Sequence, residues 1–294
     1  MPATRKTSDR TRRASASRAP ALRNGTRRAP KRELPIGIFD SGIGGLTVVR
    51  ALTRLLPDES LIYLGDTGRY PYGTKSADVV RRYSFENAQF LLDKGIKALV
   101  VACNTSSAVA LDALRAHVEV PIVGVIAPGA AAAAAATRNR KVGVIATEGT
   151  IRSGEYTRAL RAERADLEIY TRACPLFVPL AEEGWVDNDV ARRAAQLYLT
   201  SLSKSGIDTL ILGCTHYQLL KTVIRHTMGA KVKLIDSGVA TAAVARDVLA
   251  AHQLLRRTRG GESSFFVTDA PERFVKVAAR FLGAQVDSAV QLER

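Results

Sequence analysis

The chain has 294 residues, of which 46% are hydrophobic, and it carries a formal net charge of +15 at pH 7. This length and apolar content suffice for one large domain or two modest ones, and no run of roughly 18 to 20 apolar residues predicts a membrane span. The three cysteines are too few and too scattered for a disulfide framework, and the N-terminus lacks a secretory signal. We therefore expect a cytoplasmic protein with reduced thiols.

Most of the excess positive charge lies in an N-terminal extension. Residues 1–33 hold 11 Lys or Arg and two acidic residues, a net charge of +9, which leaves +6 for the other 261 residues. The extension is rich in Arg, Ala, Ser and Pro, so it buries too little apolar surface to offset the entropy of ordering. We predict a disordered basic extension over residues 1–34, able to make weak nucleic-acid contacts through residues 1–33.

From residue 35 onward, short apolar runs alternate with stretches of helical patterning. Continuous Val, Ile and Leu runs are typical of parallel strands that are covered on both faces. The predicted strands are 36–40, 60–66, 98–104, 121–126, 141–147, 167–173, 209–215 and 232–237, with a last one at 263–269. The predicted helices are 44–55, 76–94, 106–117, 190–204, 239–252 and 270–283, and the alanine run 130–136 is strongly helix-forming.

An internal repeat indicates two similar halves. The residues Gly95, Ile96, Leu99 and Cys103 recur, 111 positions later, as Gly206, Ile207, Leu210 and Cys214. We predict an α/β fold of two similar lobes, each a small mainly parallel sheet flanked by helices, with the active site in the cleft between them. Lobe 1 would comprise residues 35–127 plus 237–290, and lobe 2 residues 128–236. Duplication without functional symmetry is the alternative.

Cys103 and Cys214 each lie at the end of a predicted strand and precede polar side chains, in "CNTSS" and "CTHYQ". A single cysteine is most often a small buried hydrophobe, but two in matching positions favour a role in chemistry. A thiol needs hydrogen-bond donors or a helix N-terminus to reach its reactive thiolate form, and the helix after Cys103 would begin with Thr105 or Ser106 as its N-cap. Cys174 has no counterpart in the repeat, so we interpret it as structural.

His216, two residues after Cys214, is suited to proton transfer near neutral pH. A zinc site is disfavoured, because the chain has only four histidines and no second closely spaced Cys/His pair.

The loop "DSGIGG", residues 40–45, follows a strand and precedes a helix, as a phosphate-binding loop would. Asp40 would repel a phosphate, however, and Thr47 occupies the third glycine position of the dinucleotide fingerprint. The alternative is that the glycines let backbone amides approach a small anion while Asp40 takes part in chemistry.

Five motifs in order, "FDSGIGGLTV", "GDTGRYPYG", "ACNTSSA", "VPLAEEGW" and "LGCTHY", resemble the glutamate racemase family of the cofactor-independent aspartate/glutamate racemase superfamily. The resemblance covers about Pro35 to Leu249. It implies interconversion of L- and D-glutamate without a cofactor or metal, supplying D-glutamate for peptidoglycan, by a protein that is a homodimer.

The resemblance also implies residue roles. Cys103 would take the α-proton from D-glutamate and Cys214 from L-glutamate, with Asp40 and His216 assisting and Glu182, rather than Glu183, supporting His216. The implied substrate contacts are Asp40, Ser41, Tyr72, Gly73, Asn104, Thr105, Thr215 and His216.

Three other interpretations of the function stay open at this point. An aspartate or hydantoin racemase would share the paired cysteines. Alternatively, the extension and the folded part together would bind DNA, or would bind an enzyme that acts on DNA. A nucleotide-binding oxidoreductase would use the glycine loop at residues 40–45.

Overall fold

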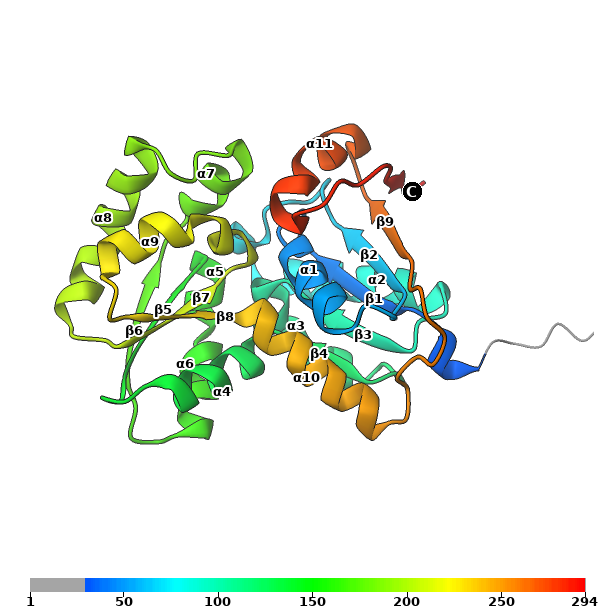
Figure 1. Cartoon of the computed structure of the whole chain (residues 1–294), viewed down its shortest axis with the longest axis horizontal. Coiled ribbons are helices and arrows are strands. Elements are labelled where there is room, and N and C mark those ends of the chain that lie inside the picture. The colour runs from blue at the N-terminus through cyan, green and yellow to red at the C-terminus, as the bar shows by residue number, and fades with distance from the viewer. Residues whose placement is uncertain (1–29, 294) are drawn as a thin grey trace, which may run out of the picture.

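The chain builds two separate parallel β-sheets, seen in a computed structural model that describes residues 30–293 (Figure 1). The first sheet has the strand order β10-β9-β2-β1-β3-β4 and the second β6-β5-β7-β8. We call each sheet with its helices a lobe, so the predicted two-lobed α/β fold is confirmed. The strands are β1 Ile36–Asp40, β2 Leu61–Gly65, β3 Ala98–Val101, β4 Ile122–Gly124, β5 Lys141–Ala146, β6 Glu168–Ala173, β7 Thr209–Gly213, β8 Lys233–Asp236, β9 Ser263–Val267 and β10 Val290–Gln291.

Helices follow nearly every strand. The α-helices are α1 Leu46–Leu55, α2 Ala77–Asp93, α3 Asn104–Arg115, α4 Ile126–Ala136, α5 Glu148–Ser153, α6 Glu155–Glu163, α7 Phe177–Glu183, α8 Asp189–Lys204, α9 Lys221–Met228, α10 Ser237–Ala251 and α11 Pro271–Leu282. Short 3₁₀ helices are η1 Lys31–Glu33, η2 Tyr72–Thr74 and η3 Thr215–Leu220. The predicted strands and helices are all present, but α5, α6, α7, α9 and β10 are additional to them.

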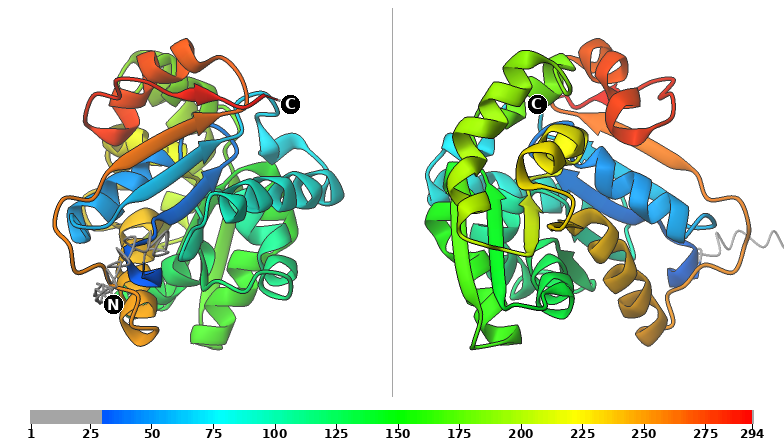
Figure 2. Two further views of the ribbon diagram at one scale, coloured as in Figure 1. Left: turned by 90° about the vertical axis from the view of Figure 1, so that its right-hand side faces the viewer. Right: turned by 60° about the vertical axis from the view of Figure 1, so that its left-hand side comes forward.

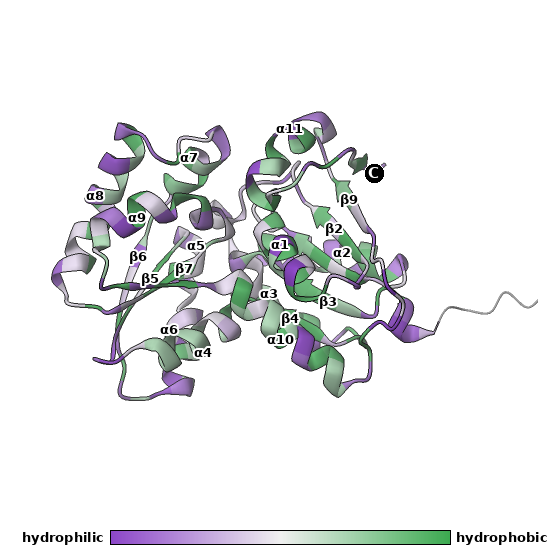
Figure 3. Ribbon diagram, in the orientation of Figure 1, coloured by the Kyte–Doolittle hydropathy of each residue, from purple (hydrophilic) through white to green (hydrophobic). Residues whose placement is uncertain are grey.

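Helices cover both faces of the first sheet, which explains its uninterrupted apolar runs (Figure 3). Successive side chains of a strand point to opposite faces, so Ile38 packs in one apolar cluster with α1, while Phe39 packs in another with α2 and α3. All five residues of β1 are buried as a result.

The sequence repeat corresponds to a repeated topology. The order β2-β1-β3-β4 in the first lobe matches β6-β5-β7-β8 in the second. Even the packing is matched, because a Cβ on Gly37 would lie 2.7 Å from Cδ1 of Ile96, and one on Gly143 would lie 2.4 Å from Cδ1 of Ile207. In each lobe an isoleucine therefore packs against a strand glycine. Cys103 and Cys214 follow equivalent strands, β3 and β7.

The chain passes from the first sheet to the second between β4 and β5 and returns between β8 and β9. At the return, α10 packs against both α1 and α4, so it lies between the lobes (Figure 2). At the opposite end of the interface, α11 of the first lobe approaches α7 of the second (Figure 1).

The last residues of the predicted extension are structured. Residues 31–33 form the 3₁₀ helix η1, and the Nζ atom of buried Lys97 donates a hydrogen bond of 2.6 Å to the carbonyl of Arg32. Disorder was therefore wrongly predicted for residues 31–33, and the prediction for residues 1–29 lies outside the described part of the chain. Within residues 30–293, no helix is both long and apolar enough to cross a membrane.

Candidate active site

The carboxyl ends of β1, β3 and β7 meet at a small buried cavity between the lobes. Its free volume is about 20 Å³, enough for about one ordered water. The sequence-predicted residues that line it are Asp40, Ser41, Tyr72, Gly73, Cys103, Asn104, Thr105, Cys214, Thr215 and His216. Tyr70, Pro71, Thr147 and Val178 line it as well and are absent from the predictions. Of the predicted set only Glu182 lies outside the lining, behind His216.

Cys103 caps the helix that follows it. Its Sγ accepts a hydrogen bond of 3.5 Å from the backbone N–H of Ser106, and α3 begins directly at Asn104. The prediction of Thr105 or Ser106 as N-cap was therefore wrong, because the strand ends at Val101 and the helix starts two residues earlier than expected. Burial, followed by the charge of Asp40, raises the pKa of Cys103 to about 11, although donors from Ser106 and Ser41 oppose this. The thiol holds its proton in the closed site.

Cys214 belongs to a chain of three interacting side chains. Its Sγ lies 3.8 Å from Nδ1 of His216, and Nε2 of His216 lies 3.0 Å from Oε1 of Glu182. Burial alone would lower the pKa of His216, but its hydrogen bonds to Cys214 and Glu182 raise it to about 10. The imidazole is then protonated at neutral pH, and its Nδ1 faces the sulfur of Cys214.

Glu182 and Glu183 differ in their surroundings. Burial raises the pKa of Glu182, but the hydrogen bond and charge of His216 outweigh it and leave that pKa lowered. The Glu183 side chain is 67% exposed and its nearest ionic neighbour is Arg273, at 4.0 Å. Only Glu182 is therefore placed to act on His216.

Asp40 is fixed by the glycine loop that follows it. Its Oδ2 accepts hydrogen bonds from the backbone N–H groups of Gly42, at 3.2 Å, and Gly45, at 3.0 Å. Burial raises the pKa of this carboxyl, while His216 and these amides work against the rise. Because the loop amides bind the chain's own carboxylate, they are not free to cradle a phosphate, and the nucleotide-binding alternative is wrong.

Two cavity-lining side chains keep an unused polar atom. Within the described residues, Oδ1 of Asp40 and Nδ2 of Asn104 are buried without a hydrogen-bond partner. The Asn104 amide is oriented by Tyr156, whose hydroxyl donates to Oδ1 of Asn104 at 2.7 Å. Buried polar groups are normally satisfied, so these atoms mark ligand positions. One acceptor and one donor suit the ammonium and carboxylate of an amino acid.

Hydroxyl groups join the lobes across the cavity. Thr105 of the first lobe lies 3.1 Å, oxygen to oxygen, from both Thr147 and Thr150 of the second. A Cβ on Gly73 would lie 2.6 Å from Cβ of Thr147, and one on Gly149 would lie 2.9 Å from the carbonyl oxygen of Gly73. The glycines therefore allow the lobes to close to this distance.

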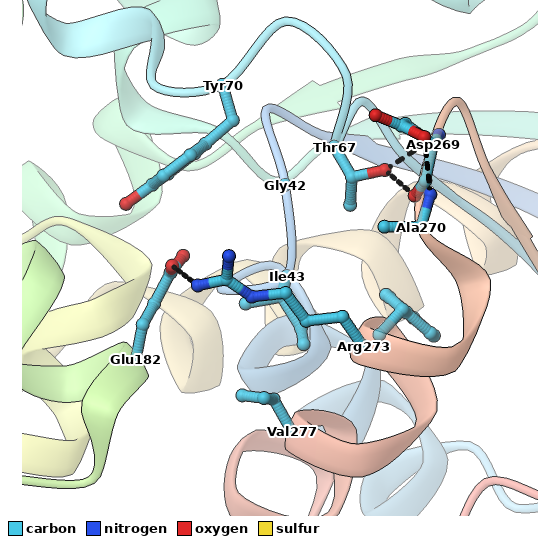
Figure 4. Close-up of a pocket in the computed structure, with 10 residues that line it drawn as sticks. Gly42, Ile43, Thr67, Tyr70, Glu182, Asp269, Ala270, Arg273 and Val277 are labelled. Carbon is cyan, nitrogen blue, oxygen red and sulfur yellow. Dashed lines mark hydrogen bonds and ion pairs between the residues drawn. The ribbon is translucent and has the colours of Figure 1, made fainter.

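A second cavity of about 190 Å³ lies outside the first, between the glycine loop, α7 and α11 (Figure 4). Tyr70 lines both cavities, and Glu182 faces the outer one. From α11, Nη2 of Arg273 lies 3.8 Å from Oε2 of Glu182, and Nη1 of Arg280 donates to the Glu182 carbonyl at 2.8 Å. The sequence pattern gave no functional role to α11 or to Tyr70.

The remaining candidates lie apart from the site. Cys174 is fully buried at the end of β6, outside the cavity lining, and its carbonyl accepts a hydrogen bond from Tyr217. Across residues 30–293 no three His, Cys, Asp or Glu side chains are grouped as metal ligands would be.

The chain belongs to the Asp/Glu/hydantoin racemase family, whose model matches residues 41–245. It is 55% identical over 258 residues to the glutamate racemase of Geobacter metallireducens, covering 87% of this chain and 96% of that relative. Among solved structures, it resembles a glutamate racemase of Bacillus anthracis, with a TM-score of 0.86, 40% identity and coverage of 89% and 98% of the two chains. The Francisella tularensis glutamate racemase, solved in complex with D-glutamate, gives a TM-score of 0.84 and 38% identity over 89% and 98% of the chains.

Proposed function

We propose that this protein interconverts L- and D-glutamate by transferring protons at Cα, and so supplies D-glutamate for peptidoglycan. The observation that carries the proposal is the pair Cys103 and Cys214, which follow equivalent strands of the two lobes and line one buried cavity. Family membership and the high identity to glutamate racemases over nearly their whole length support the same substrate.

The proposed mechanism uses one sulfur as the base and the other as the acid. From L-glutamate, the Cys214 thiolate, stabilised by the His216 imidazolium, takes the α-proton and the electron pair stays on Cα. The Cys103 thiol, whose burial keeps it protonated, then gives its proton to the opposite face of Cα. From D-glutamate the roles of the sulfurs exchange. The two acid–base groups act on opposite faces of Cα, so the proton lost from one face is replaced on the other and the configuration is inverted.

The substrate would bind through polar groups of both lobes. The free Oδ1 of Asp40 suits the ammonium, and Nδ2 of Asn104 suits a carboxylate oxygen. Hydroxyl and backbone groups of the other predicted contacts complete the shell: Ser41, Tyr72, Gly73, Thr105, Thr215 and His216.

Glutamate is far larger than a cavity of about 20 Å³, so the lobes must separate to admit it. We take residues 35–127 plus 237–290 and residues 128–236 as the two bodies that move. Closure around the substrate then excludes water from the carbanion.

Racemisation in deuterium oxide tests the proposal. L-glutamate is incubated with the protein alone, and optical rotation and α-deuterium are followed beside Cys103→Ser, Cys214→Ser and the control Cys174→Ser. We expect racemisation with deuterium in the product, reduced about 100- to 10,000-fold in the first two variants and retained in the control. Absence of exchange in the unaltered protein would reject the function, and faster turnover of aspartate would change the substrate.

Three further proposals concern oligomeric state, location and partners, and the first rests on the family resemblance. We propose a homodimer, for which the exposed apolar side chains Leu176, Trp185 and Val190 offer a surface that a second copy would cover. Light scattering after gel filtration tests it, and a monomer would reject it.

We also propose a cytoplasmic location and weak nucleic-acid contact through residues 1–33. Deletion of those residues should abolish binding at moderate salt, and unchanged binding would reject the contact.

A further inference from the structure

Tyr70 is the side chain that separates the two cavities. It lines the inner cavity together with Cys214 and His216, and the outer one together with Glu182 and Arg273. It lies in the loop between β2 and η2, in the first lobe, whereas Cys214, His216 and Glu182 all belong to the second. Tyr70 is thus a contact made across the interface.

Two different parts of Tyr70 contact the Glu182–His216 pair. Its ring stacks on the imidazole, with centroids 6.1 Å apart and planes inclined by 27°. Its hydroxyl points toward the Glu182 carboxylate (Figure 4), and this neighbour contributes to lowering the pKa of Glu182. One side chain therefore fixes both the plane of the imidazole and the carboxylate that binds it.

Asp40 of the first lobe interacts electrostatically with His216, and two further groups that face the pair come from α11. Phe281 meets the imidazole edge-on, with centroids 5.2 Å apart, and Arg273 lies 3.8 Å from Glu182. Arg273 is 68% exposed, so solvent screens its charge. Among the neighbours of Glu182 other than His216, Tyr70 is the one that also touches the imidazole.

We propose that Tyr70 is a positioning residue for proton transfer at Cys214, acting from the facing lobe through the Glu182–His216 pair. This inference rests on the proposed racemase function. The physical basis is that a histidine presents one nitrogen in the direction set by the partner of the other. Glu182 holds Nε2, so Nδ1 points to Cys214, and Tyr70 prevents the pair from rotating away. Because the contact crosses the interface, it is made only when the lobes are closed.

The test compares Tyr70→Phe, which keeps the ring and removes the hydroxyl, with Tyr170→Phe. Tyr170 is a matched control, since it is half-buried and its hydroxyl donates to Glu168 at 3.0 Å, far from the cavity on β6. We expect kcat/KM to fall about tenfold in Tyr70→Phe and to stay unchanged in the control. The fall must be equal in both directions, because enantiomers have equal free energies in water. Thermal melting checks that each variant folds.

Isotope effects on kcat/KM show which of the two proton transfers is slowed in Tyr70→Phe. With α-deuterated L-glutamate, Cys214 removes the label, so slowing that step in Tyr70→Phe should increase the isotope effect. With α-deuterated D-glutamate, Cys103 removes the label and Cys214 acts later, so the isotope effect should decrease. The acid limb of the pH profile should also move to higher pH, since the loss of a donor raises the pKa of Glu182. A merely structural defect would produce none of these opposite shifts.

A double variant tests whether Tyr70 acts through Glu182 or independently of it. If Tyr70 acts through Glu182, then in a Glu182→Gln background the change Tyr70→Phe costs little more activity. Full additivity, or isotope effects that change in the same direction for both enantiomers, overturns the inference. Absence of racemisation in the unaltered protein would instead reject the proposed function.

Discussion

Gly44 of the first lobe lies directly against His216 of the second. A Cβ built on Gly44 would lie 2.5 Å from Nδ1 of His216 and 2.2 Å from Oγ1 of Thr215, both well inside van der Waals contact. The glycine of "DSGIGG" is therefore required by the motif "CTHY" in the other half of the chain. Gly44 and Thr215, which are 171 residues apart in the sequence, therefore meet at one point.

Gly44→Ala tests this contact. The added methyl group must displace the imidazole that faces Cys214, and a displacement of about 1 Å in a catalytic group costs on the order of 100-fold in rate. We expect a loss of that size in kcat/KM. Gly129→Ala is the control, because its Cβ would make ordinary contacts of 3.4 Å or more. Equal activity in the two variants would contradict the predicted clash.

Glu182→Gln should lower the pKa of His216. The carboxylate contributes to raising that pKa to about 10, so without it the imidazolium loses its proton at a lower pH. We expect the alkaline limb of the pH–rate profile to move to lower pH and kcat/KM to fall about 10- to 100-fold. Glu183→Gln, on an exposed neighbour, should leave the profile unchanged. An alkaline limb at the same pH in both variants would refute the role of Glu182.

Stability should decrease on the alkaline side. His216 is protonated in the folded protein up to about pH 10, but in the unfolded chain only up to about pH 6.5. Its contribution is therefore complete below the unfolded value and lost as the pH rises through the folded value. The raised pKa of Cys103 acts in the same direction. Urea unfolding between pH 7 and 10 should show a flatter dependence for His216→Gln than for the unaltered protein or for His226→Gln.

Gly149→Ala should weaken substrate binding by holding the lobes apart. Its Cβ would lie 2.9 Å from the carbonyl of Gly73, a backbone atom that cannot rotate away. The hydroxyl contacts between Thr105 and Thr147 would lengthen with it. We expect KM to rise about tenfold, with a thermal midpoint close to that of the unaltered protein. An unchanged KM would mean that the two lobes still close fully with the added methyl group.

The sequence predicted most of the fold because the strands carry long apolar runs. β1 matches its predicted bounds, and the other predicted strands agree within a few residues. The largest error lies at the catalytic loops. The strands predicted to end at Asn104 and Thr215 stop at Val101 and Gly213, because a helix begins immediately after each cysteine. Short elements such as α5, α7 and β10 escape prediction, since tertiary packing rather than local pattern fixes them.

The site was predictable as far as its residues lie in motifs. Asp40, Cys103 and Cys214 all line the cavity, as their motifs indicate. Tyr70 lies in the motif "GDTGRYPYG", but its contact with the Glu182–His216 pair, like the position of Thr147, depends on how the two lobes meet, which no local pattern encodes. The glycine loop also needed the structure, because only there are its amides seen to bind Asp40.

The small size of the closed cavity has a consequence for how turnovers follow one another. With room for about one water, the carbanion is shielded from bulk protons, so each cycle leaves the two sulfurs with exchanged protonation states. The emptied protein then exists in two forms, each competent toward one enantiomer, and it regains its starting form only by proton exchange with solvent or by consuming the opposite enantiomer. At high substrate concentration this recovery of the starting form, rather than the chemical step, would be rate-limiting.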